Sequence, residues 1–277
     1  MKKRIQILFA AILLTLHSLS NAGEIVIDKI PKGSDGDVYK FVKFTGQIEK
    51  GDARKLANFI TKNYEWIETI NLYSAGGDLN EAIMMGEIIR ASRIDTVVQP
   101  GAICASACFF IWINGPDRVM FSNPPPNKKT GLVNPSKIGL HRPYLKSITN
   151  TDKSISKQEY IMQATIKYLQ KRMVPNRLIE IMMGRGSNDI YWINYDDQIE
   201  LGFTPHELEE LYISHCNDNR KTLYREISIA REEGNTSLEK GLMARLAKIR
   251  ACIDNLNYEA RSKAVASGFN SILEGIF

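Results

Sequence analysis

Residues 67–92 read IETINLYSAGGDLNEAIMMGEIIRAS, and this stretch decides the fold class. Ile67 to Tyr73 combines β-branched, aromatic and polar residues in the way that predicts a short strand. Leu79 to Ser92 repeats apolar residues at intervals of three and four, which predicts an amphipathic helix. Gly76-Gly77 between them marks a turn. The stretch therefore predicts one strand-turn-helix unit.

The same alternation of short strands and helices continues from Glu24 to Gly202. Further strands are predicted at Val38–Ile48, Thr96–Gln99, Arg118–Phe121 and Ile138–His141, and further helices at Asp52–Lys62, Ser106–Ile113, Lys157–Met173 and Asn176–Met183. Strands that alternate with helices in this way imply βαβ units and a largely parallel sheet. We therefore predict an α/β fold, with one main domain over residues 23–204.

After Gly202 the pattern becomes helical. Helices are predicted at Pro205–Ile213, Asn219–Glu232 and Ser237–Glu259, with a turn at Gly234-Asn235 before the last. Apolar residues spaced by three or four predict a hydrophobic seam along the last helix, at Leu238, Leu242, Leu246, Ile249, Ile253 and Leu256. Residues 205–277 thus form a predicted helical extension that contains a hairpin.

The first 22 residues have the pattern of a secretory signal peptide. Lys2-Lys3-Arg4 precedes an apolar run from Ile5 to Leu16, and small residues follow near Ala22. A membrane anchor is the alternative, but the run falls short of the ~20 residues that span a bilayer. No second apolar run of that length follows, so we predict an exported chain without an integral membrane span, periplasmic or secreted.

Charge gives no sign of a nucleic-acid partner. Residues 1–22 hold three of the 36 Lys and Arg residues and none of the 31 Asp and Glu residues, so removing them lowers the net charge from +5 to +2. A net charge this small gives no argument for nucleic-acid binding.

Residues 101–110 read GAICASACFF, and Ser106 within them is the best candidate nucleophile. Small residues on both sides leave it open to a substrate carbonyl. The glycine turn supplies backbone N–H donors, and the stretch IGLHRP at 138–143 supplies a base in His141. The other three histidines lie in the signal peptide or the helical extension, so His141 is the one base candidate of this type in the main domain.

Four cysteines in an exported chain indicate disulfides. Cys104 and Cys108 flank Ser106 at a spacing of one helical turn, and Cys216 and Cys252 lie in two helices of the extension. Two pairs are therefore expected. A zinc site and four reduced, buried cysteines are the alternatives; we expect no metal and no cofactor.

Three motifs in this order, Ile70 to Gly77, Gly101 to Ala107 and Leu140 to Pro143, resemble the ClpP serine peptidase family, in particular its exported, periplasmic ClpP-like branch. The resemblance covers about residues 36–204. It implies a ClpP/crotonase-like spiral of βαβ units and a Ser-His-Asp triad. It also implies that the backbone N–H groups of Gly77 and Ala107 form an oxyanion hole.

The resemblance further assigns His141 as the base and Asp189 as the aspartate that orients it. The spacing from Asp189 to Gly202 is about one residue longer than the family pattern, which leaves Asp196 or Asp197 as alternatives. The sequence also departs from the family at Ala75, where a proline is usual. The family's ATP-driven partners are not expected for an exported chain.

The leading hypothesis is an exported serine hydrolase, specifically a peptidase, that acts on a polypeptide or ester substrate. A catalytically inactive ClpP-like scaffold or binding protein is the alternative from another class. A CoA-dependent crotonase activity shares the fold, but acyl-CoA is a cytoplasmic substrate. The resemblance leaves room for a homo-oligomer, and the sequence names neither the substrate nor the oligomeric state.

Overall fold

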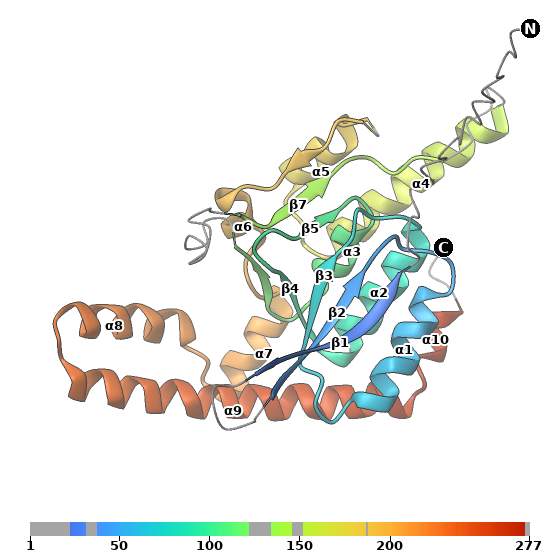
Figure 1. Cartoon of the computed structure of the whole chain (residues 1–277). Helices are drawn as coiled ribbons and strands as arrows, with labels where there is room; N and C mark the ends of the chain where they lie inside the picture. The colour runs from blue at the N-terminus through green and yellow to red at the C-terminus, as the bar shows by residue number, and fades with distance from the viewer. Residues whose placement is uncertain (1–22, 32–37, 122–133, 146–151, 187, 275–277) are drawn as a thin grey trace, which may run out of the picture.

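The computed structural model describes residues 23–31, 38–121, 134–145, 152–186 and 188–274. Within these ranges the chain forms a sheet of five strands, a sheet of three strands and a set of helices packed around them (Figure 1). The predicted signal peptide at residues 1–22 lies outside them.

The larger sheet has the strand order β1-β2-β3-β4-β6. Its strands are β1 (Glu24–Pro31), β2 (Val38–Thr45), β3 (Thr69–Tyr73), β4 (Asp95–Val98) and β6 (Arg118–Met120). The last four are parallel, and β1 pairs with β2 in the antiparallel direction. The sequence prediction did not include β1, which joins β2 as an edge ribbon.

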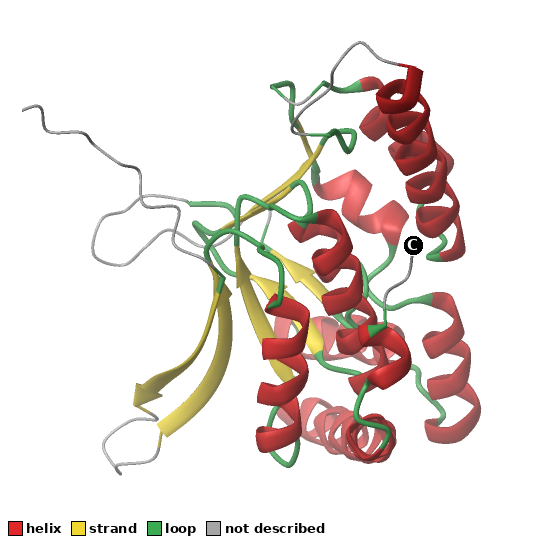
Figure 2. Ribbon diagram, turned by 90° about the vertical axis from the view of Figure 1, so that its right-hand side faces the viewer, coloured by secondary structure: helices red, strands yellow, loops and turns green. Residues whose placement is uncertain are grey.

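Three helices connect these strands: α1 (Asp52–Asn63), α2 (Leu79–Ser92) and α3 (Cys108–Trp112). Alternate strand residues are buried, such as Ile70 and Leu72 in β3, while their neighbours are partly exposed. Figure 2 shows most of the helices on one side of the strands. The hydrophobic core therefore lies between one face of the sheet and these helices.

The smaller sheet carries the segments that the sequence analysis singled out. Its strands, in the order β5-β7-β8, are β5 (Ile103–Ala105), β7 (Lys137–Leu140) and β8 (Tyr191–Trp192). β5 is parallel to β7, and β8 is antiparallel to it. A backbone bridge from Ser74 to Cys104 joins β5 to the end of β3. The sequence did not predict β5 and β8, because strands of two or three residues have no measurable period.

Three further helices precede and follow β8 in the chain: α4 (Asp152–Lys171), α5 (Asn176–Gly184) and α6 (Tyr195–Leu201). Tyr168 of α4 is buried, donates a 2.8 Å hydrogen bond to Glu87 of α2 and accepts one of 2.8 Å from Asn114. These bonds tie the C-terminal part of α4 to the main core.

The C-terminal helices are α7 (His206–Cys216), α8 (Arg220–Glu232), α9 (Thr236–Ala266) and α10 (Asn270–Leu273). The predicted hairpin is formed by α8 and the first part of α9, which extend beyond the body of the protein (Figure 1). Its seam buries Leu242 and Leu246 against α8, whereas Leu238 at the tip is 47% exposed. α9 then runs along α1 and α2, and Phe269 after it is buried in the main core.

The α/β architecture with parallel strands and C-terminal helices, predicted from the sequence, is confirmed. In the residues that the structure describes, no helix combines the length and apolar character needed to cross a membrane.

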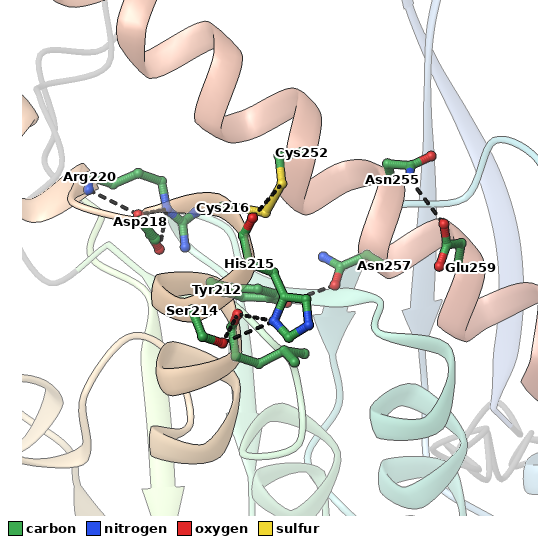
Figure 3. Close-up of a disulfide and its surroundings, with 11 residues drawn as sticks. Tyr212, Ser214, His215, Cys216, Asp218, Arg220, Cys252, Asn255, Asn257 and Glu259 are labelled. Atoms are coloured by element: carbon green, nitrogen blue, oxygen red, sulfur yellow. Dashed lines mark hydrogen bonds and ion pairs between the residues drawn. A yellow bond between two sulfur atoms is a disulfide. The ribbon is translucent and has the colours of Figure 1, made fainter.

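A disulfide joins α7 to α9 at the base of the hairpin. Cys216 and Cys252 have a sulfur–sulfur distance of 1.99 Å, which confirms the predicted pairing. Figure 3 shows the bridge beside His215 and the ion pair of Asp218 with Arg220. The bridge therefore fastens the hairpin to the helix that leads into it.

We predict that Cys216→Ser combined with Cys252→Ser lowers the free energy of unfolding by about 3 to 4 kcal/mol, because the bridge closes a long loop in the unfolded chain. The two cysteines are 36 positions apart. Urea unfolding measures the effect. An unchanged free energy of unfolding would show that packing alone holds the hairpin.

Asp95, the first residue of β4, lies in a cluster of charges between the sheet and α8. Its Oδ1 accepts a 3.0 Å hydrogen bond from the backbone N–H of Asp117, whose own carboxylate pairs with Arg220 at 3.2 Å. Burial and the nearby Asp117 carboxylate raise the pKa of Asp95 to about 8, against the opposing effects of the Asp117 N–H and Arg220.

We predict that the wild type loses stability relative to Asp95→Asn as the pH rises from about 4 to about 8. An acid with a raised pKa in the folded state binds more protons folded than unfolded, so its contribution to stability falls over this interval. Denaturant unfolding of both proteins across this range measures the difference. Asp196→Asn, at an exposed position, is the control and should follow the wild type. If the difference in the free energy of unfolding between the wild type and Asp95→Asn does not vary with pH, the pKa of Asp95 is not raised in the folded protein.

Candidate active site

Ser106 stands at a sharp turn between β5 and α3. Its φ of 55° is left-handed, a conformation that few residues other than glycine adopt. Its N–H donates a 2.8 Å hydrogen bond to the Gly139 carbonyl of β7, and its side chain is partly exposed. A serine held in a strained strand-to-helix turn is a frequent arrangement for a nucleophile.

A disulfide spans this turn. Cys104 and Cys108 have a sulfur–sulfur distance of 2.06 Å and a Cα–Cα distance of 5.2 Å, and both side chains are fully buried. The predicted pairing is confirmed. The disulfide links the middle residue of β5 to the first residue of α3, so it fixes the two ends of the segment that carries Ser106.

The glycine turn after β3 lies directly against Ser106. A Cβ at Gly76 would approach the Ser106 Cβ to 2.8 Å and the Ala107 nitrogen to 3.0 Å. Only a residue without a side chain fits at this position. The φ of Gly76, 105°, also favours glycine. Two backbone hydrogen bonds bring the two turns together. The Ser74 N–H donates to the Ile103 carbonyl at 2.8 Å, and the Ala105 N–H donates to the Ser74 carbonyl at 3.0 Å.

Gly77 and Ala107 are the predicted oxyanion donors. In the loops and helix caps that the structure describes, the N–H groups of these two residues make no backbone hydrogen bond. The neighbouring groups are occupied, since the Gly76 carbonyl accepts from Ile48 and the Asp78 N–H donates to Ile48. N–H groups that lack a backbone partner in the described turns, and that flank the meeting point of these turns at Ser106, are chemically suited to stabilise a developing oxyanion.

His141 follows the last residue of β7. In the parallel register Ala105 pairs with Gly139, so Ser106 and His141 both leave the carboxyl ends of adjacent strands, which lie about 4.8 Å apart. The structure thus brings His141 to the same edge as Ser106. Among the described residues, however, Ser106 and His141 form no hydrogen bond. The His141 Nδ1 lies instead 2.9 Å from the Arg142 carbonyl oxygen.

Asp189 lies near this edge, but its carboxylate points to another partner. It lies two residues before Tyr191 of β8, which pairs with Leu140, the residue before His141. Its carboxylate accepts two hydrogen bonds from Arg185, at 2.9 and 3.1 Å, and is 58% exposed. In the part of the chain that the structure describes, Asp189 makes no hydrogen bond to His141, and its predicted catalytic role stays a prediction.

The two alternative aspartates lie at the start of α6. Asp196 is exposed. Asp197 is buried, caps the helix together with Asn194, and accepts hydrogen bonds from Tyr191 and Arg177. Although burial opposes its ionisation, these hydrogen bonds hold the pKa of Asp197 below its usual value. Its contacts are those of a residue that stabilises the local fold.

Gln158, which the sequence analysis did not single out, contacts the segment after His141. Its side-chain amide donates a 2.7 Å hydrogen bond to the Pro143 carbonyl and accepts one of 2.9 Å from the Leu145 N–H. A glutamine on a long polar helix carries no signal in the sequence. Only the packing of α4 reveals its contact with this segment.

No protein-family model matches the chain, and no curated protein matches it in sequence. Among solved structures it is similar to a mutant of the 1510-N membrane-bound stomatin-specific protease, with 18% identity, a TM-score of 0.41, and coverage of 61% of this chain and 80% of that chain. It is also similar to a mutant of ClpP1 from Listeria monocytogenes, with 13% identity, a TM-score of 0.34, and coverage of 57% and 84%. Both TM-scores lie below 0.5, so neither comparison assigns an activity or a residue role to this chain.

We predict that Gly76→Ala lowers the reactivity of Ser106 toward a fluorophosphonate by about 100-fold, because the new methyl group displaces the serine turn. The rate of covalent labelling measures it. Gly51→Ala is the matched control: its φ of 98° is similar to the 105° of Gly76, but a Cβ there meets nothing within 4 Å. Equal reactivity of the two variants would show that the glycine turn does not shape the site.

Proposed function

We propose that the protein is a serine hydrolase, and specifically a peptidase, with Ser106 as nucleophile and His141 as general base. The observation that carries the proposal is the meeting of three segments: a strained, partly exposed serine, a glycine turn within van der Waals distance of it, and a histidine at the end of the adjacent strand. These are the parts that acyl transfer requires.

In the proposed reaction His141 removes the proton from Ser106 Oγ as this oxygen attacks the substrate carbonyl carbon. The carbonyl oxygen becomes an oxyanion, which accepts hydrogen bonds from the N–H groups of Gly77 and Ala107. The tetrahedral intermediate then collapses, and the imidazolium returns its proton to the leaving amine or alcohol. Water hydrolyses the acyl-enzyme by the same steps.

Two groups are candidates for orienting the His141 ring. Asp189 is the one predicted from the sequence, and it would have to exchange Arg185 for the imidazole. The Arg142 carbonyl is the other, and it already lies at hydrogen-bonding distance from Nδ1. The absence of a Ser106–His141 hydrogen bond in the described residues is compatible with catalysis, since such bonds are often long before substrate binds.

We further propose a polypeptide or ester as substrate and an exported protein, periplasmic or secreted, that is released from the signal peptide at residues 1–22. The two disulfides support an oxidising compartment. Residues 23–204 would form the catalytic domain and residues 205–277 an extension that packs against it. A homo-oligomer remains compatible with this proposal.

The alternative proposal is a catalytically inactive scaffold that uses the same fold for binding. The ion pair of Asp189 with Arg185 favours it, because the predicted carboxylate of the triad is engaged elsewhere. The two proposals differ in one property, which is the chemical reactivity of Ser106.

We predict that a fluorophosphonate labels Ser106, and that Ser106→Ala and His141→Ala abolish the labelling, because a serine without its base is a poor nucleophile at neutral pH. Mass spectrometry of the peptides locates the adduct. Ser214→Ala and His206→Ala are matched controls at exposed positions of α7 and should label like the wild type. Labelling at another serine would overturn the site, and an unlabelled wild type would favour the scaffold.

A further inference from the structure

The five residues from His141 to Leu145 form a segment that α4 and α5 hold in place. We propose that Gln158 of α4 is a positioning residue: it anchors this segment so that the Arg142 carbonyl accepts a hydrogen bond from the His141 Nδ1–H and thereby sets the tautomer of the base. This inference rests on the proposed function, because it assigns His141 the role of general base.

The contact of His141 with Arg142 determines which ring nitrogen is basic. A carbonyl oxygen can only accept a hydrogen bond, so the Nδ1 that lies 2.9 Å from it carries the proton. In a neutral imidazole the other nitrogen, Nε2, then has the free electron pair. A general base needs this tautomer, and a backbone carbonyl selects it without a carboxylate.

The carbonyl can do this only if its own peptide is fixed, and three features fix it. Pro143 restricts Arg142 to extended conformations. The Arg142 N–H donates a 3.2 Å hydrogen bond to the Arg185 carbonyl at the end of α5. Gln158 completes the arrangement, because its amide pairs with the Pro143 carbonyl at 2.7 Å and with the Leu145 N–H at 2.9 Å.

Gln158 is suited to this role because its side-chain amide, like a peptide group in a β-sheet, carries both a hydrogen-bond donor and an acceptor. It both donates and accepts, and its two partners lie on either side of Tyr144, whose ring packs against the His141 ring with centroids 5.7 Å apart. The histidine is therefore held from two directions, by its own Nδ1 contact and by the ring next to it. His141 is 8% exposed.

Asp189 does not compete for Nδ1 in this arrangement. Both of its carboxylate oxygens accept from Arg185, and the pair is largely exposed. Exposed ion pairs of this kind contribute little to stability. Removing the charge of Asp189 should therefore leave the imidazole as it is, whereas loosening the segment at Gln158 should not.

The experiment measures the tautomer of His141 directly, by long-range ¹H–¹⁵N NMR of the full chain with ¹⁵N-labelled histidine. The sequence has only four histidines, so His141→Ala assigns the signal. The variants are Gln158→Met, which keeps length but removes both hydrogen bonds, and Asp189→Asn. Gln163→Met is the matched control, since Gln163 is exposed on the same helix. The rate of fluorophosphonate labelling of Ser106 is followed for each variant as a function of pH.

The wild type and Gln163→Met should both show a protonated Nδ1, and their labelling rates should agree within about threefold. Asp189→Asn should keep the protonated Nδ1, because its partner is Arg185. Gln158→Met should show a mixture of tautomers, a labelling rate about 10- to 100-fold lower, and a displaced pH profile. Circular dichroism verifies that each variant is folded.

Two results would overturn the inference: Gln158→Met with the wild-type tautomer and pH profile, or Asp189→Asn with a changed tautomer and a loss of about 10⁴ in rate, which is the effect of removing an orienting carboxylate. A wild type whose His141 Nδ1 carries no proton would also overturn the inference, and this result does not depend on the folding of Gln158→Met. If the fluorophosphonate does not label Ser106 in the wild type, the proposed function is refuted. The NMR signal of His141 would still report whether Gln158 positions the ring.

Discussion

The candidate site depends on the backbone hydrogen bonds of β5, a strand of three residues. On one side β5 bonds to Ser74 at the end of β3, through the Ile103 carbonyl and the Ala105 N–H. On the other side it pairs with β7. The glycine turn follows β3, Ser106 follows β5 and His141 follows β7, so these bonds bring the three segments to one edge of the sheet.

This constraint explains several choices of residue type around the serine. The close approach of β3 to β5 leaves no room for a side chain at Gly76. The short connection to α3 forces Ser106 into a left-handed conformation, and the bridge between Cys104 and Cys108 holds both ends of the turn. The same turn leaves the Ala107 N–H without a backbone partner in the described residues. The local strain and the free donor therefore have one cause.

Much of this arrangement could be predicted from the sequence, since α2 has the predicted bounds and β3 lies within its predicted range. The two expected cysteine pairs are also present, although Cys104 lies in strand β5 and not on a helical turn with Cys108. The short strands β5 and β8 could not be predicted, because their formation depends on partners distant in sequence. The predicted hydrophobic seam included Leu238, which is exposed in the structure, because periodicity does not reveal where the partner helix ends.

The partners of the site residues were hardest to predict. The aspartate spacing indicated Asp189, but its pairing with Arg185 depends on how the chain turns after α5. The contact of Gln158 with the segment after His141 depends on the position of α4, which no local pattern records. Side-chain roles of this kind follow from tertiary packing rather than from residue type.

The most direct test of the account is a crystal structure of the protein after reaction with a fluorophosphonate. The account predicts a phosphonyl group on Ser106 Oγ whose oxygen lies about 2.7 to 3.1 Å from the backbone nitrogens of both Gly77 and Ala107. An adduct on another residue, or a phosphonyl oxygen that faces solvent away from both nitrogens, would contradict it.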